Sequence, residues 1–243
     1  MADIDYLPRN WFKSMRRAAA ASDAVRNMLL VYNPEYHTLY THFLGDALPG
    51  EWASAKTNGT SAAVTVASSQ LTQTAGTDDN GYAGNGYGLF WTGTRGFYME
   101  TAFAIDTVTS SKIEIGVTDA VDDAGAVATK ATPTATADDF VVLVRDTDDN
   151  TELDLISGSN TTITANAENV YTVVGATVFR AEFRGRGTKV AAYVNSKHVG
   201  DGTLTAADAL TPWIFTQARA VSASRIGTAE YLLMTGPSGV SAI

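Results

Sequence analysis

Two neighbouring segments of this chain, residues 97–105 and 112–117, place most of their bulky apolar side chains on odd-numbered positions. The apolar residues fall on the odd positions Phe97, Met99, Phe103, Ile105, Ile113, Ile115 and Val117. Successive side chains of a β-strand point to opposite faces of a sheet, so a period of two is typical of half-buried strands. Because the pattern recurs along the chain, we predict an all-β sandwich of two antiparallel sheets, each with one face in water.

From residue 39 onward, clusters of Gly, Asn, Asp and Ser separate short alternating or apolar segments, as turns separate strands. The predicted strands are 39–44, 51–55, 62–67, 70–74, 87–92, 97–105, 112–118, 139–146, 152–156, 161–165, 170–175, 178–184, 188–195, 211–219 and 230–235. Residues 76–88 and 118–138 are predicted loops. Residues 140–144 are apolar at every position, which indicates a central strand covered on both faces, on one of them by a loop.

The segment 178–194 is predicted to be a hairpin, because charged and apolar residues alternate on both sides of a Gly185-Arg186-Gly187 turn. A second reversal is expected at residues 195–197. The side chains predicted to lie buried between the two sheets are Phe103, Ile115, Val142, Phe183 and Val194. The outward face of the hairpin carries Arg180, Glu182, Arg184, Lys189 and Tyr193. We interpret it either as a solvated face with cross-strand ion pairs or as a face for sugar or protein, with Arg180, Arg184 and Tyr193 as the candidate ligand residues.

The amino-terminal residues differ from the rest of the chain in pattern and in charge. Apolar residues recur near a helical spacing over 10–32, and Asn33-Pro34 ends the pattern, so we predict one helix or two short ones in an arm of residues 1–38. Residues 1–30 hold five basic and three acidic side chains, although the whole chain has a net charge of −9. The arm residues expected to bind a partner are Trp11, Phe12, Lys13, Arg16 and Arg17; the alternative is a helix that caps the sandwich.

Composition excludes several classes of protein. The chain has 243 residues, of which 45% are hydrophobic, enough for one large sandwich domain over residues 39–243. No cysteine is present, which removes disulfides, thiolate metal sites and cysteine nucleophiles. The acidic balance argues against binding of nucleic acid, and no apolar run is long enough to cross a membrane. Residues 1–5 lack the features of a signal peptide, so we expect synthesis in the cytoplasm.

Catalytic and metal-binding motifs are weak. Glycoside hydrolases on sandwich folds need paired carboxylates on one strand face, whereas Glu100 and Glu114 stand alone and are expected to face water. His37, His42 and His198 are scattered. Asp146, Asp148 and Asn150 alternate like calcium ligands, but we interpret them as a solvated turn between two strands, because Asp and Asn favour turns on their own. We therefore expect no enzyme activity, no catalytic residues, no metal site and no cofactor.

Residues 46–234 resemble concanavalin A-like, laminin G-like jelly-roll domains. The segments that carry the resemblance are 96–100, 112–119, 140–146, 190–195 and 210–214. At the 195–196 turn the family usually has Asn-Gly or Asp-Gly, whereas this chain has Ser196 in place of the glycine. The loops rich in Ala, Thr, Asp and Gly are similar to those of structural proteins of tailed phages.

The resemblance implies a structural protein of a phage virion. It implies a capsid decoration subunit whose arm docks on the major capsid protein or other virion subunits and stabilises the shell by binding only the assembled lattice. The alternative is a carbohydrate-binding adhesin module of a head or tail fibre, with a cell-surface glycan as partner, because one fold hosts both roles. A homo-oligomer and a location in the virion are further expectations of this resemblance.

Overall fold

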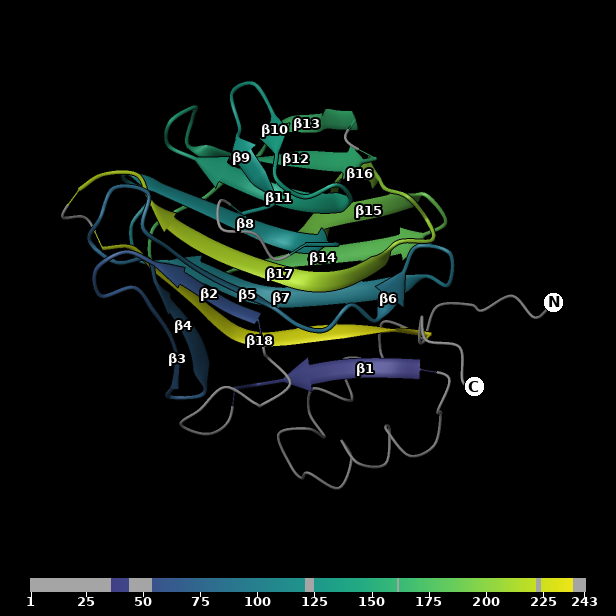
Figure 1. The fold of residues 1–243 in the computed structure, drawn as a ribbon, viewed down its shortest axis with the longest axis horizontal. Helices are drawn as coiled ribbons and strands as arrows, with labels where there is room; N and C mark the ends of the chain where they lie inside the picture. The colour runs from purple at the N-terminus through teal and green to yellow at the C-terminus, as the bar shows by residue number, and fades with distance from the viewer. Residues whose placement is uncertain (1–35, 44–53, 121–124, 161, 222–223, 238–243) are drawn as a thin grey trace.

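The computed structural model describes residues 36–43, 54–120, 125–160, 162–221 and 224–237, which form eighteen β-strands and no helix. Two eight-stranded antiparallel sheets stack face to face, as Figure 1 shows. The expectation of an all-β, two-sheet sandwich is confirmed. The expected helix at 10–32 lies outside the described residues.

Sheet A has the strand order β16-β15-β14-β7-β18-β4-β3, and β1 also pairs with β18. Its strands are β1 (Tyr36–Thr41), β3 (Ala63–Ala67), β4 (Gln70–Thr74), β7 (Phe97–Ile105), β14 (Phe179–Arg186), β15 (Lys189–Val194), β16 (Lys197–Thr203) and β18 (Ile226–Pro237). Three consecutive strands, β14 to β16, form a meander, whereas β7 and β18 meet from distant parts of the chain. The centre of sheet A therefore depends on pairings that local sequence does not specify.

Sheet B has the order β13-β12-β11-β8-β17-β5-β2, with β6 paired to β17. Its strands are β2 (Ser54–Asn58), β5 (Tyr82–Gly86), β6 (Trp91–Thr92), β8 (Ser111–Thr118), β11 (Phe140–Asp146), β12 (Glu152–Ser159), β13 (Thr162–Thr172) and β17 (Ala209–Ala218). The short hairpin of β9 (Val127–Thr129) and β10 (Thr134–Ala135) belongs to neither sheet. It lies in front of β11 and β12 in Figure 1.

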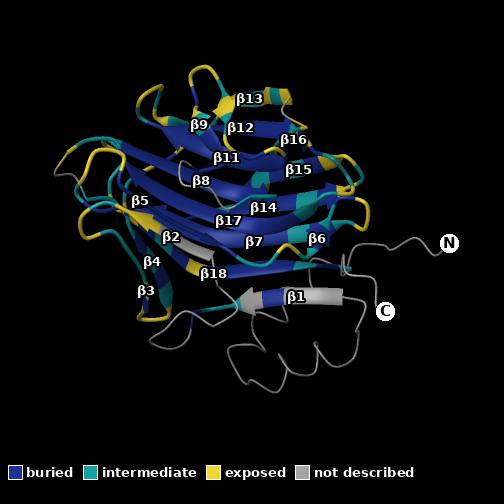
Figure 2. Cartoon of the chain, in the orientation of Figure 1, coloured by how far each residue is buried: buried dark blue, intermediate teal, exposed yellow. Residues whose placement is uncertain are grey.

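The main core fills the space between the sheets. The predicted residues Phe103, Ile115, Phe183 and Val194 are all buried in it, together with Phe97, Met99, Ile105, Ile113 and Val117 of β7 and β8. Figure 2 shows the central strands of both sheets in the dark blue of buried residues. The period of two therefore identified the core face of these strands correctly.

A second apolar cluster lies on the other face of sheet B. Its members include Phe140, Val142 and Val144 of β11, Trp213 and Phe215 of β17, and Ala126, Val127 and Ala137 of the crossing segment 125–137. The prediction that Val142 lies between the sheets is therefore wrong, because Val141 and Leu143 hold that face of β11. The prediction that residues 140–144 are covered on both faces, on one by a loop, is confirmed.

Some predicted boundaries differ from the observed ones. Residues 82–86, predicted as part of a loop, form β5, and residues 162–165 and 170–172 of two predicted strands belong to the single bulged strand β13. Gly185 is not a turn residue: it pairs inside β14, where a Cβ would meet the Phe97 ring at 2.2 Å. The reversal is made by Gly187, with φ of 61°. At the next turn Asn195 and Ser196 both have positive φ, 49° and 71°, as a type I′ turn requires.

Candidate functional site

The outer face of sheet A carries a polar and aromatic group of side chains that we call the arginine–tyrosine face. Its members are Tyr98 and Glu100 of β7, Arg180, Glu182 and Arg184 of β14, Tyr193 of β15 and Tyr231 of β18. The register places Glu182 opposite Glu100 on one side and opposite Tyr193 on the other. Even positions of β7 and β14 point away from the core, so the alternation that built the core also gathers these side chains.

The two glutamates form the buried floor of this face. Glu100 is 3% exposed and Glu182 is 1% exposed. The Tyr98 and Tyr231 hydroxyls donate hydrogen bonds to Glu100, and the Tyr98 hydroxyl also lies 3.4 Å from a Glu182 carboxylate oxygen. The expectation that Glu100 faces water is therefore wrong: it does point away from the core, but neighbouring tyrosines and arginines cover it.

Arg180 and Arg184 lie above the glutamates and remain partly exposed, at 26% and 29% of their side chains. Arg180 Nη2 lies 3.0 Å from one Glu182 oxygen, and Arg184 Nη2 lies 3.2 Å from the other. The Arg184 guanidinium stacks 4.4 Å from the Tyr193 ring centroid. Charge-assisted pairs and ring stacking hold both guanidinium groups in place, so they present fixed donors beside an aromatic surface.

Sequence reasoning proposed Arg180, Arg184 and Tyr193 as a ligand face, and the structure brings these three side chains together. Its interpretation as a face with cross-strand ion pairs also agrees with the contacts observed. It placed Glu182 on the same face but did not propose it as part of the site, and it missed Tyr98 and Tyr231. The alternation of residues 179–184 placed Glu182 on the same face as the arginines, but only the pairing of β14 with β7 and β15 shows that it joins them.

The outer face of sheet B contains a second carboxylate, Glu114, which is fully buried. Its oxygens accept hydrogen bonds from the backbone N–H groups of Ala126 and Val127 and from Trp213 Nε1. Lys112 Nζ lies 2.8 Å from Glu114 and also donates to the Val127 carbonyl. The expectation that Glu114 is exposed is wrong, because segment 125–137 crosses the sheet and closes over it.

Gly125 is the residue that lets this segment approach Glu114. It has φ of 84°, and a Cβ there would meet the Glu114 carboxylate oxygens at 2.5 and 2.6 Å. Gly187 has a similar φ of 61° with nothing within 4 Å of a built Cβ. The two glycines therefore have a similar backbone conformation, but only Gly187 has room for a Cβ atom.

We expect Gly187→Ala to lower the free energy of unfolding by about 1–2 kcal/mol, the cost of a left-handed conformation. Gly125→Ala should lose that amount and about 1–3 kcal/mol more, because the new methyl group overpacks the buried carboxylate. Urea unfolding of both variants measures the difference. Equal losses would show that segment 125–137 does not press on Glu114.

The Asp146–Asn150 turn is held by cations of the chain itself. Arg219 pairs with Asp146 and lies 3.5 Å from Asp148, while Lys130 Nζ lies 3.2 Å from Asp149 and donates to Asn150. The backbone N–H groups of residues 149 and 150 donate to the Asp146 carbonyl, as in a turn. These contacts favour the interpretation as a turn over the interpretation as a calcium loop.

The other residues named in the sequence analysis are not part of the arginine–tyrosine face or of the Glu114 cluster. The arm residues Trp11, Phe12, Lys13, Arg16 and Arg17 lie outside the described residues. His198 pairs with Asp201 at 2.9 Å on the surface of sheet A. Within the described ranges no helix is long and apolar enough to cross a membrane.

No protein-family model matches the chain, and no curated protein matches its sequence. Solved structures do share its fold. LamAcat from Zobellia galactanivorans superposes with a TM-score of 0.58 at 8% identity, over 81% of this chain and 96% of that one. Peanut lectin gives a TM-score of 0.55 at 11% identity, over 86% of this chain and all of that one (100%).

A third similar structure comes from work on endo-acting O-glycanases of the human gut microbiota. Its TM-score is 0.57 at 9% identity, over 81% of this chain and 97% of that one. The neighbours are thus lectin-like jelly-roll domains that include both carbohydrate-binding proteins and glycosidases. At these identities the similarity establishes the fold, and nothing in it shows a virion origin.

The expectation that this chain is not an enzyme is contradicted by these comparisons. The O-glycanase and LamA are glycoside hydrolases, and their domains share the sandwich described here. The missing carboxylate motif argued against one arrangement of catalytic residues. The absence of that motif did not exclude an enzyme with this fold, because catalysis depends on the residues of a site and not on the fold that carries them.

Proposed function

We propose that this chain is a glycan-binding β-sandwich domain whose ligand lies on the arginine–tyrosine face. The observation that carries the proposal is the stacking of Arg184 on Tyr193 while buried Glu182 holds both Arg184 and Arg180. Sugars present hydroxyl groups that accept hydrogen bonds and C–H faces that pack on aromatic rings. Fixed guanidinium donors beside a partly exposed tyrosine match both features.

The buried glutamates give this face the preorganisation that a binding site needs. A guanidinium held by a carboxylate underneath loses little conformational freedom when a ligand arrives, so less of the interaction energy is lost to ordering. The fold supports the same proposal: one solved structure with this sandwich is LamA in complex with laminaritriose and laminaritetraose, at a TM-score of 0.58.

The test is a glycan array followed by calorimetry on the hits. We expect Arg184→Ala to weaken binding at least about tenfold, because a hydrogen bond to a charged group contributes ~1.5–3 kcal/mol. Tyr193→Ala should weaken binding by a similar factor, because its ring supplies the packing surface for the sugar. Lys189→Ala is the matched control, since Lys189 is an exposed cation at the end of β15. Unchanged affinity in both face variants, or no glycan bound by the wild-type chain, contradicts the proposal.

A capsid-decoration role and a location in the virion rest on the sequence alone. Their support is the basic, aromatic segment with Trp11, Phe12, Lys13, Arg16 and Arg17 on an otherwise acidic chain. Mass spectrometry of purified particles, which measures whether the chain is present and in what copy number, tests this second candidate role. It is compatible with glycan binding, because a surface subunit can do both.

A further inference from the structure

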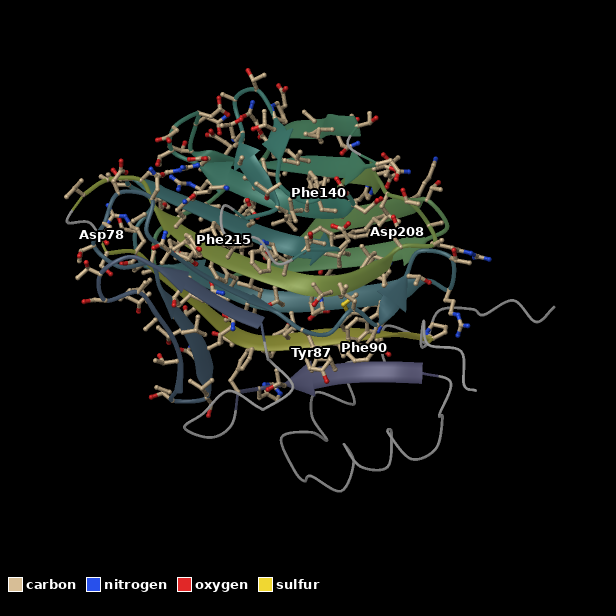
Figure 3. The ribbon with its side chains drawn as sticks, in the orientation of Figure 1. Asp78, Tyr87, Phe90, Phe140, Asp208 and Phe215 are labelled. Atoms are coloured by element: carbon tan, nitrogen blue, oxygen red, sulfur yellow. The ribbon has the colours of Figure 1, made fainter. Side chains whose placement is uncertain are left out.

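One edge of sheet A is formed by β3, a strand of five residues that pairs only with β4 among the described strands. β3 lies at the lower left corner of the sandwich in Figure 1. Residues 57–77 contain no charged side chain and no proline, and Asp78, which ends this run, lies above that corner in Figure 3. Natural proteins usually protect an open edge strand with charges, prolines or bulges, so an edge without them is suited to pairing with another strand.

The opposite edge of the same sheet does carry such protection. Its edge strand β16 contains Lys197, His198 and Asp201, and its pairing with β15 shifts between Ala192 and Tyr193. The pairing of β3 with β4, in contrast, is regular over all five residues. The two edges of sheet A therefore differ in their capacity to accept a further strand.

The turn of the β3–β4 hairpin decides which backbone groups of β3 face the open edge. Residues 68–69, both serine, have φ of 54° and 61° and lie between the paired residues Ala67 and Gln70. A two-residue turn of this type makes the flanking residues a hydrogen-bonded pair, and such pairs alternate along antiparallel strands. Ala67 and the residues two and four positions before it therefore bond to β4. The N–H and C=O groups of Val64 and Val66 point to the open edge.

The sequence of β3, Ala-Val-Thr-Val-Ala, reads the same in both directions around Thr65. Two copies of this strand that lie antiparallel and centred on Thr65 therefore place Val64 of each copy opposite Val66 of the other. Because both valines direct their backbone groups to the open edge, each such pair exchanges two hydrogen bonds, and the two Thr65 residues form the non-hydrogen-bonded pair between them. The register that two-fold symmetry requires is thus the register that the backbone groups allow.

The side chains on both faces of β3 also suit a second copy. Val66 is buried in the main core and Val64 is partly buried against it, so pairing brings the valines of the two copies together on the inner face. On the outer face, exposed Thr65 lies in a cross-strand row with Thr72 of β4 and Thr228 of β18. Pairing at Thr65 extends this row into the second copy, and threonine pairs across strands are favourable.

We propose that two copies of this chain associate through β3, in an antiparallel pair centred on Thr65, so that their A sheets form one continuous sheet. The interface is isologous, with a two-fold axis between the two Thr65 residues. Because a five-residue strand buries less surface than a standard interface of about 1,600 Å², we expect a dissociation constant above about 1 μM. The axis is perpendicular to the sheet, so the arginine–tyrosine faces of both copies lie on the same side and stay uncovered. The dimer does not depend on the proposed glycan binding.

Sedimentation equilibrium of the full chain, from about 1 μM to about 1 mM, measures this association over the range that a small interface requires. We expect the average mass to rise from 25.7 kDa toward twice that value. Thr65→Lys and Thr65→Glu should each abolish the rise, because each places like charges directly opposite one another at the axis. An equimolar mixture of the two variants should associate at least about tenfold more strongly than either variant alone, since the opposed charges then attract.

Thr203→Lys is the matched control, because Thr203 is an exposed threonine of β16 at the other edge of the same sheet, and it should associate like the wild type. Val64→Pro is a second test variant. It removes an N–H group that points to the open edge and should weaken association without breaking a bond to β4. A wild-type chain that stays monomeric over the whole range overturns the proposal. Equal loss of association in Thr203→Lys and Thr65→Lys, or a mixture of the charged variants that stays monomeric, overturns it as well.

Discussion

Replacing Glu114 with glutamine is expected to lower the free energy of unfolding by about 3–5 kcal/mol, the cost of removing one partner of a buried ion pair. Glu114 and Lys112 are both fully buried, 2.8 Å apart. The variant keeps the shape of the side chain but removes the negative charge that neutralises Lys112. It also weakens the bonds from Trp213 Nε1 and from the N–H groups of segment 125–137.

Chemical denaturation with fluorescence detection measures this loss. Glu230→Gln is the control, because Glu230 is an exposed glutamate of β18, and it should change stability by less than about 0.5 kcal/mol. Adding Lys112→Met to Glu114→Gln should recover part of the loss, since the buried positive charge is then gone. A loss below about 1 kcal/mol in Glu114→Gln would mean that water reaches the carboxylate.

The second large effect is expected for Phe183→Ala, which should lower the free energy of unfolding by about 3–5 kcal/mol, the range for large aromatic truncations in cores. Phe183 is fully buried between the sheets, and its neighbours in the register are Met99 and Ala192. The variant loses the transfer free energy of the ring and leaves a cavity. Val174→Ala is the control, because Val174 is exposed in the loop after β13 and should change little.

A measured loss under about 1 kcal/mol in Phe183→Ala, far below the range for aromatic truncations, would contradict the assignment of core and solvent faces in β14. The arginine–tyrosine face depends on the same assignment, since Arg180, Glu182 and Arg184 point to the side opposite Phe183. This one variant therefore tests the geometry on which the proposed glycan face rests.

Much of the fold was predictable because alternate residues of a β-strand point to opposite faces of the sheet, so a buried face appears in the sequence as apolar residues at every second position. The strands over residues 97–105 and 112–118, and the burial of Phe103, Ile115 and Phe183, follow from that alternation. Alternation fails where both faces are apolar. Residues 140–144 looked buried throughout, but nothing local decides which side of β11 meets the other sheet, so Val142 was placed on the wrong side.

The glutamates show the same limit for polar residues. Alternation correctly predicted that the Glu100 and Glu114 side chains point away from the main core. The error was to assume that a side chain pointing away from the core is exposed to water. Glu114 is covered by a segment that returns to sheet B after leaving it, and Glu100 by partners on β14 and β18. Apart from Tyr98, the residues that cover them lie between 12 and 131 positions away, and a local period does not report such contacts.

By itself the sequence determined the all-β class, the strands with a strong period of two and the direction in which their side chains point. These are local properties, because backbone geometry sets them within a few residues. Only the tertiary structure decided the strand order. That order brings Arg180, Glu182 and Arg184 beside Tyr98 and Tyr193, and it leaves β3 at an open edge of sheet A. Register between distant strands is set by the packing of the whole core, so no single segment carries it.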